Sequence, residues 1–149
     1  MSDEENFTAL KPGDQEQQMT YLRQLQWRYP EETSKIDENR LMEIVRHGLH
    51  LCPPLRIDDP KEIVRFLALS VLLTPGQKRS ALICTVVLRV MMAVQEWRAT
   101  KRLNFVYKFV IGRAPPALEP DFGPWFILDT QSEPAIYQEF GDVIFANLD

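Results

Sequence analysis

Three side chains in one stretch of the sequence have the types and the spacing of a metal site. Glu43, His47 and His50 follow one another at steps of four and three residues, and Cys52 lies two residues further on. On an α-helix this spacing places the first three on one face, and carboxylate, imidazole and thiolate groups are common zinc ligands. The chain has 2 histidines in all, whereas a complete site needs further ligands. We therefore expect exposed or capping roles for these side chains, with no metal and no cofactor, and keep a small metal-binding protein or enzyme as the alternative.

Other catalytic patterns are missing from the sequence. It contains no nucleophile elbow, no glycine-rich phosphate loop, no dinucleotide fingerprint and no H-E-x-x-H pair, and its 6 glycines are dispersed. Cys52 directly precedes Pro53, and Cys84 lies in an apolar run, so neither has the setting of a nucleophile. The sequence predicts two inert, buried thiols and a protein that is not an enzyme.

The charge balance argues against nucleic acid as a partner. Seventeen Lys and Arg residues face 21 Asp and Glu residues, which gives a net charge of -4 and no overall positive field. Lys78-Arg79 and the basic residues between 98 and 102 flank one predicted helix, and we interpret them as solvated helix ends. The acidic first residues do not resemble a secretory signal, so we expect a cytoplasmic protein. Residues 81–94 are apolar but shorter than the roughly 20 residues of a membrane span, so they predict a buried helix.

The length of 149 residues predicts one domain. We expect residues 1–13 to form a flexible N-terminal tail and residues 14–149 to form the single domain. Composition divides that domain in two, with a helical core at 14–102 and a β-containing segment at 103–149.

Four segments of the core have the apolar period of helices, namely residues 15–29, 34–52, 60–72 and 75–99. Asp59 and Thr74, each followed by proline, have the order of an N-cap and an N1 residue, and Ser34 with Asp37 resembles a capping box. Gly48 lies on the apolar stripe of the second helix, where glycine costs about 1 kcal/mol relative to alanine. Its presence predicts a close helix crossing or a local helix end.

The C-terminal third has a different composition. Aromatic and β-branched residues fill Phe105–Ile111, which predicts a strand, and two shorter strands are expected at Trp125–Leu128 and Val143–Phe145. Between the last two we expect a short helix over residues 134–140, ended by Gly141. The predicted class is therefore α+β, an N-terminal four-helix core followed by a short β-containing segment rich in aromatic residues and proline.

Aromatic residues in this segment are the candidate partner-binding surface. Phe122, Trp125, Phe126 and Tyr137 lie in a stretch interrupted by prolines. If they stay exposed, they form a docking surface for another protein. If they pack against a second copy of the chain, the protein is a self-assembling structural subunit.

One block of the sequence also resembles a known family. Between Tyr29 and Leu73 the chain contains, in order, Tyr29-Pro30-Glu31, Ile44-Val45-Arg46-His47-Gly48 and Ile63-Val64-Arg65-Phe66-Leu67. This block resembles the small, mostly uncharacterised helical proteins encoded beside spike, PAAR-tip and toxin genes of bacterial type VI secretion systems. Their pattern is similar to an aromatic-Pro-Glu start, a V-x-x-G helix and a D-V-x-R-F core helix. Here Glu62-Ile63 replaces the Asp-Val pair, and Leu55-Arg56 replaces a tyrosine-glycine pair before the core helix.

The resemblance implies a shared helical fold and a role in protein binding, and it brings no catalytic residues with it. We therefore expect a non-enzymatic, cytoplasmic interaction module. Its partner would be a type VI secretion toxin or spike component, and its role that of an adaptor, a chaperone or an immunity factor.

Overall fold

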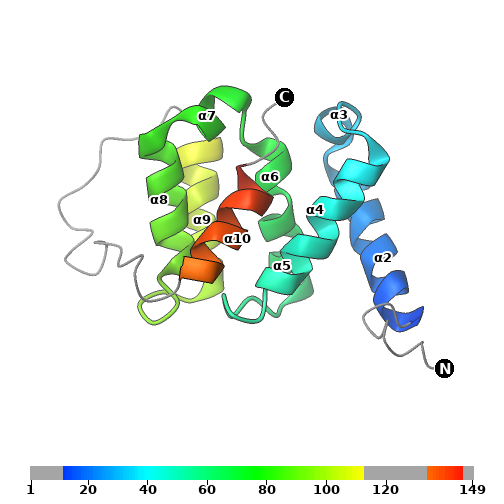
Figure 1. Cartoon of the computed structure of the whole chain (residues 1–149), viewed down its shortest axis with the longest axis horizontal. Coiled ribbons are helices and arrows are strands. Elements are labelled where there is room, and N and C mark those ends of the chain that lie inside the picture. The colour runs from blue at the N-terminus through cyan, green and yellow to red at the C-terminus, as the bar shows by residue number, and fades with distance from the viewer. Residues whose placement is uncertain (1–11, 113–133, 146–149) are drawn as a thin grey trace.

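A computed structural model describes residues 12–112 and 134–145, and every regular element in these two ranges is a helix (Figure 1). In chain order the elements are α2 (Pro12–Arg28), α3 (Pro30–Thr33), α4 (Glu38–Leu51), α5 (Pro60–Leu67), α6 (Leu69–Leu72), α7 (Pro75–Arg79), α8 (Ala81–Met92), α9 (Ala99–Val106), the π-helix η2 (Tyr107–Ile111) and α10 (Pro134–Ile144). The predicted α+β class is wrong for this part of the chain, which is all-α.

Two of the predicted helix starts are confirmed by their caps. The Asp59 carboxylate accepts a hydrogen bond from the Lys61 backbone N–H, and Thr74 with Gln77 forms a complete capping box. The start near Ser34 is wrong by one turn. The Ser34 hydroxyl donates to the Glu31 carbonyl and does not cap α4. Asp37 caps this helix instead, because its carboxylate accepts from the Asn39 N–H at 3.1 Å.

Two predicted helices are interrupted in the structure. The third divides at Ala68 into α5 and α6, and the fourth divides at Ser80 into α7 and α8. Ser80 has extended backbone angles (φ -80°, ψ 119°), and its hydroxyl accepts from the Ile83 N–H, so it ends α7 and caps α8. The continuation towards Ala99 is also wrong, because α8 ends at Met92 and α9 begins at Ala99.

The strand predicted at Phe105–Ile111 belongs to α9 and η2 instead. Its buried side chains, with Leu103 before it, are spaced by three and four residues (Leu103, Val106 and Val110), which is the period of a helix. The β preference of aromatic and branched residues is weak, and packing against helices overrides it here.

The strand predicted at Val143–Phe145 is the end of α10. The expected short helix at 134–140 is confirmed at its start, but it continues through Gly141 to Ile144 because Phe140, Val143 and Ile144 share one buried face. The strand predicted at Trp125–Leu128 lies outside the described residues.

The centre of the bundle is the place where α10 meets helices from the first half of the chain. In Figure 1 α10 lies amid the other helices, with α4, α5 and α6 on one side and α8 and α9 on the other, while α2 forms the outer edge beside α4. The ring centroids of Phe66 and Phe140, both fully buried, are 6.1 Å apart. The Ser70 hydroxyl donates to the Val143 carbonyl oxygen at 2.8 Å, so a buried polar group also finds its partner across this junction.

Gly48 lies at a close crossing of α4 and α5, as one of the two sequence alternatives predicts. A Cβ atom built on Gly48 would lie 2.2 Å from Cδ2 of Leu67, which is only 1% exposed. The absence of a side chain at this position therefore sets how closely the two helices approach.

The turn between α4 and α5 contains a backbone conformation that favours glycine. Arg56 has a φ of 58°, the one positive value among the non-glycine residues that the structure describes. The Ile57 N–H donates to the Cys52 carbonyl at 2.9 Å, and the Arg56 N–H donates to the Pro53 carbonyl at 3.0 Å. These two bonds are the pattern of a Schellman motif, whose left-handed position Arg56 occupies.

Candidate functional site

The residues proposed as metal ligands lie on α4 but do not come together as a site. Glu43 accepts from Arg40 at 3.1 Å, and His50 Nε2 lies 3.4 Å from Glu139 Oε2 on α10. His47 is exposed. Within the described ranges no three His, Cys, Asp or Glu side chains are grouped so that they could hold a metal ion.

Both cysteines are free thiols. Cys52 is buried, and Cys84 is half-buried. Burial raises the pKa of Cys52 to about 12, and it also raises the pKa of Cys84. The Cys84 thiol lies 3.0 Å from the Lys78 carbonyl oxygen. Both groups therefore stay protonated near neutral pH, and a protonated thiol is a poor nucleophile.

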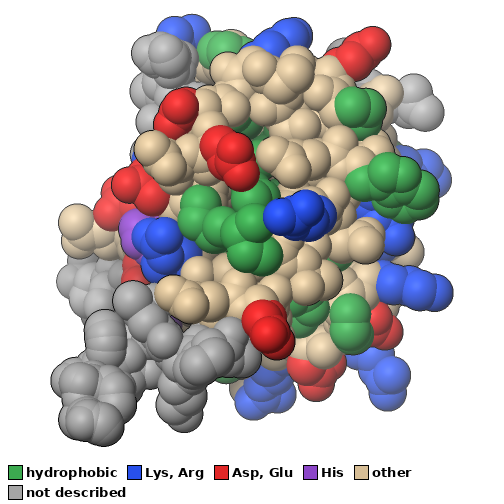
Figure 2. All heavy atoms as spheres, turned by 90° about the vertical axis from the view of Figure 1, so that its right-hand side faces the viewer, with side chains coloured by type: hydrophobic (Ala, Val, Ile, Leu, Met, Phe, Trp, Pro, Cys, Tyr) green, Lys and Arg blue, Asp and Glu red, His purple; other side chains and the backbone are tan. Residues whose placement is uncertain are grey.

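The predicted aromatic docking surface cannot be followed in the structure. Phe122, Trp125 and Phe126 lie outside the described residues, and Tyr137 lies on α10, where only the backbone is described at that position. Among the described side chains Trp27 on α2 is the most exposed large apolar group, at 75%. Figure 2 views the molecule from the side of α2 and shows apolar side chains in a central area and at the right-hand margin, with charged groups of both signs between them.

A pocket of about 580 Å³ lies between the α3–α4 connection and the α6–α7 connection. This volume lies in the usual range of ligand pockets, roughly 300 to 1,000 Å³. One wall is formed by Glu32, Lys35, Ile36, Asp37 and Arg40, and the other by Ser70, Val71, Leu72, Leu73, Thr74, Pro75 and Lys78.

Lys78 is the least expected residue of this pocket. Its side chain is 6% exposed, although it is a lysine, and Nζ donates to the Ser70 carbonyl oxygen at 2.5 Å. Burial lowers its pKa to about 8, and the positive charge of Arg40 acts in the same direction. A perturbed cation in a concave site is a typical feature of functional sites.

The position of Lys78 follows from the way α7 is held. The capping box fixes the first turn of α7, with Gln77 accepting from the Thr74 N–H at 2.9 Å. The same Gln77 amide donates to the Val110 carbonyl in η2 at 2.8 Å. Gln77 thus anchors α7 to η2, and Lys78, the next residue, is directed towards α6 and the Ser70 carbonyl.

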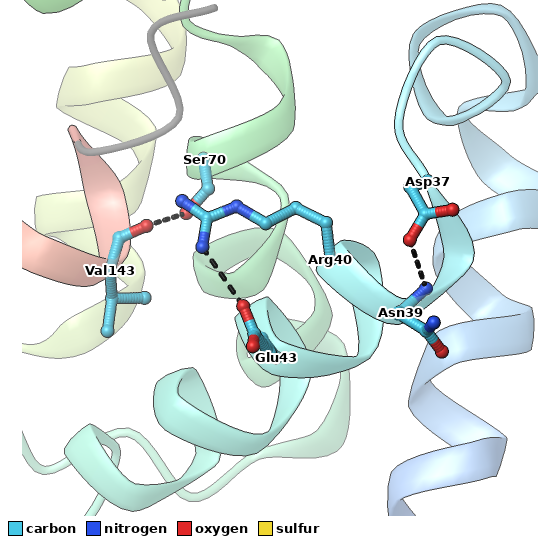
Figure 3. Close-up of polar contacts among 6 residues, drawn as sticks. All are labelled: Asp37, Asn39, Arg40, Glu43, Ser70 and Val143. Atoms are coloured by element: carbon cyan, nitrogen blue, oxygen red, sulfur yellow. Dashed lines mark hydrogen bonds and ion pairs between the residues drawn. The ribbon is translucent and has the colours of Figure 1, made fainter.

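Arg40 approaches the pocket from the opposite wall. Figure 3 shows its side chain extending from the first turn of α4 towards the side of Ser70, with one nitrogen bonded to Glu43. In the same view the Asp37 carboxylate turns back onto the Asn39 N–H. Asp37 therefore caps the helix while Arg40 and Lys78 bring positive charge to the two walls.

A second, smaller concave site of about 380 Å³ lies between the turn before α5 and the start of α9. It combines Asp58, Asp59 and Glu62 with arginines, and burial together with the two aspartates raises the pKa of Glu62. Its arginine Arg102 is bonded to three backbone carbonyls. The carboxylates and arginines of this site interact with one another, and the hydrogen bonds of Arg102 stabilise the fold.

Sequence reasoning missed the 580 Å³ pocket because it treated Lys78 as a solvated helix end. The prediction is wrong for this residue, which the structure buries. The helix starts at Asp37 and Thr74 each place a basic residue, Arg40 or Lys78, on a first turn, but they do not show that Lys78 is buried or that the two turns meet. The meeting of the two turns depends on tertiary packing.

Comparison of the chain with models of protein families, with curated proteins and with solved structures finds no match. Among the described residues, no helix combines the length and the apolar character that crossing a membrane requires.

Proposed function

We propose that this chain is a non-enzymatic, cytoplasmic protein-interaction module that binds a toxin or spike component of a type VI secretion system. It acts in this proposal as an adaptor, chaperone or immunity factor. The proposal starts from the block Tyr29–Leu73, which resembles small proteins encoded beside such components.

One structural observation supports a binding role for that block. It spans α3, α4, α5 and α6, and most of the residues around the 580 Å³ pocket belong to it. Thr74, Pro75 and Lys78, which complete the pocket, follow the block directly. The part of the chain that carries the resemblance thus presents a concave surface as well as core positions.

The test is recovery of the partner from the cells that produce the protein. Tagged full-length chain is purified, bound proteins are identified by mass spectrometry, and each candidate is then produced separately and titrated against the purified chain. A toxin or spike component that binds directly with a defined stoichiometry supports the proposal. Recovery of no secretion component, or of one that does not bind the purified chain, overturns it.

The predicted aromatic surface enters this test through point variants. Truncation after Gly112 would remove Phe140, Val143 and Ile144 from the core, so loss of binding by a truncated chain would reflect loss of the fold. Simultaneous replacement of Phe122, Trp125 and Phe126 by alanine keeps α10 in the chain. Binding lost in this variant, with an unchanged melting temperature, would assign the partner surface to these aromatic residues. Unchanged binding would exclude them.

A further inference from the structure

We propose that the groove between α2 and α5 binds an acidic segment of a partner protein, in which carboxylate side chains are followed by large aliphatic ones. The inference goes beyond the proposed function, which assigns no surface of α2 to the partner. It rests on the proposed function only insofar as the segment belongs to a protein. The groove itself is argued from its lining and its charge.

The groove follows one face of α2. Its first hollow, of about 310 Å³, is lined on this side by residues three or four positions apart, namely Gln17, Thr20, Tyr21, Gln24 and Arg28. The first two turns of α5 form the other side, with Pro60, Lys61 and Val64. Gln17 and Arg28 are 11 residues apart in one helix. This face is therefore about 16 Å long, the length of about five residues of extended peptide.

The charged side chains that line the first hollow are both basic. Arg28 and Lys61 are exposed, and the lining contains no carboxylate among the residues that the structure describes. Within the same part of the chain neither side chain forms an ion pair. The carboxylates next to Lys61 in the sequence, Asp58, Asp59 and Glu62, line the separate 380 Å³ site together with arginines. The hollow thus has an unbalanced positive charge, which is complementary to an acidic ligand.

Contacts with uncharged groups hold Arg28 in place. Its Nε donates to Oε1 of Gln24 at 3.2 Å, and its guanidinium carbon lies 5.8 Å from the centre of the Trp27 ring. Neither contact neutralises the charge, and the two Nη nitrogens can donate to a carboxylate in the paired geometry that arginine favours. Lys61, on the facing helix, provides a second cation for the same ligand.

A second hollow continues the groove at Gln17, which lines both. This hollow has a volume of about 640 Å³ and lies against the end of α4 and the turn that follows it. Arg56 and Asp58 contribute one charge of each sign to it. Its apolar lining residues are Leu49, Cys52, Pro53, Ile57 and Ile63. Large aliphatic side chains are therefore favoured in the second hollow, whereas carboxylates are favoured in the first.

The groove can be tested with three synthetic peptides and the full-length chain labelled with ¹⁵N. Ser-Glu-Glu-Leu-Leu-Ser is compared at low ionic strength with Ser-Gln-Gln-Leu-Leu-Ser and Ser-Glu-Glu-Ser-Ser-Ser, all with blocked ends. We expect the first peptide to shift the amide signals of residues that line the two hollows. It should bind about fivefold or more tightly than either control peptide, as two exposed ion pairs or two buried leucines would give. Equal binding of the first peptide and either control, or shifts confined to other regions, would overturn the inference.

Variants at exposed basic residues supply the matched controls. Lys61→Gln and Arg28→Gln, made singly, should each weaken binding of the first peptide about threefold or more. Arg23→Gln, an exposed change on α2 outside the groove, should leave it unchanged, and Lys61→Arg should retain it. Because these side chains are exposed, all four variants should keep the melting temperature of the wild type. Wild-type affinity in Lys61→Gln or in Arg28→Gln would refute the assignment. Tighter binding of inorganic phosphate than of the first peptide would refute the carboxylate class.

The two proposals fail in different ways. If a secretion component binds equally well to the wild type and to the double variant Arg28→Gln, Lys61→Gln, the groove assignment fails and the proposed function stands. If the first peptide binds as described but no secretion component is recovered, the groove stands and the proposed function fails.

Discussion

The guanidinium group of Arg102 lies 2.8 Å from the carbonyl oxygen of Leu55, 47 residues earlier in the chain. The same group donates to the Met91 carbonyl at 2.6 Å and to the Trp97 carbonyl at 3.0 Å. Burial lowers the pKa of Arg102 to about 10, and the Glu62 carboxylate opposes this effect. At neutral pH Arg102 is therefore a cation, 1% exposed, that joins the turn before α5 to both ends of the α8–α9 connection.

Replacement of Arg102 by methionine should be among the most destabilising single changes in the chain. The variant keeps much of the side-chain volume but leaves three carbonyl oxygens without their donor, and we expect a loss of about 3–5 kcal/mol in the free energy of unfolding. Urea denaturation followed by far-UV circular dichroism measures this. Arg102→Lys retains the charge with fewer directed donors, so its loss should be intermediate. A loss below about 1 kcal/mol for the methionine variant would contradict the role of these bonds.

Sequence reasoning located the helix starts better than it located the site. Proline after a capping residue is a local signal, and it was correct at Asp59 and Thr74 because the cap needs only neighbouring backbone groups. The prediction of a strand at residues 105–111 was wrong. Branched and aromatic residues suit a strand and a buried helix equally, and contacts distant in sequence decide between the two.

The pocket and the buried cations depend wholly on such distant contacts. Nothing near Lys78 or Arg102 in the sequence distinguishes them from the exposed basic residues beside them. Their carbonyl partners, Ser70 and Leu55, lie 8 and 47 residues away. Burial of a cation can be predicted only once the path of the whole chain is known.

Gly48→Ala should destabilise the protein despite the higher helix propensity of alanine. The added Cβ would lie 2.2 Å from Leu67 Cδ2, so the buried leucine must move. Overpacking of a core costs about 1–3 kcal/mol, and the gain in propensity offsets about 1 kcal/mol of that. We expect a net loss of up to about 2 kcal/mol by urea denaturation. In a Leu67→Val background, which removes a methylene at the contact, the same change should cost less; equal costs in both backgrounds would rule out this contact as the cause.

Arg56→Gly should stabilise the chain. A non-glycine residue in the left-handed region lowers the stability of the folded chain by about 1–2 kcal/mol, and glycine removes this cost. Glycine also gives the unfolded chain more conformational entropy, which lowers stability by about 0.4–1 kcal/mol. The net gain should be up to about 1.6 kcal/mol, seen as a higher midpoint of thermal unfolding. The same change at Arg46, an exposed position inside α4, should instead destabilise by about 1 kcal/mol. Loss of stability in the Arg56 variant would contradict the strain inferred from its φ of 58°.

The stability of the protein should increase with pH between about 8 and 9 because of Lys78. Its pKa in the folded chain, about 8, is below the ordinary lysine value of 10.5, so the unfolded chain binds more protons than the folded chain once the pH exceeds about 8. The free energy of unfolding then rises with pH. Cys52, whose pKa is raised to about 12 from 9.0, and Cys84, whose pKa burial also raises, act in the opposite direction as the pH approaches 9, so the rise in the wild type is smaller than Lys78 alone would give.

The comparison that isolates this effect uses Lys78→Met. Urea denaturation at pH 7, 8 and 9 should show a rise for the wild type that is absent from this variant. Lys61→Met, an exposed change on α5, should retain the rise. A difference in unfolding free energy between the wild type and Lys78→Met that does not change over this interval would show that the Lys78 ammonium is not disfavoured by its surroundings.

The bond between Ser70 and Val143, 73 residues apart, has a consequence for the order in which the chain folds during synthesis. Helices α2 to α9 emerge from the ribosome before α10, and until then the place of Phe140 against Phe66 is open to water. Until α10 emerges, the nascent chain therefore exposes the apolar surface around Phe66 to water, and water takes the place of the Val143 carbonyl as the partner of the Ser70 hydroxyl. Closure of the core is a late event, and the time before α10 arrives is the period in which the chain is most exposed to aggregation.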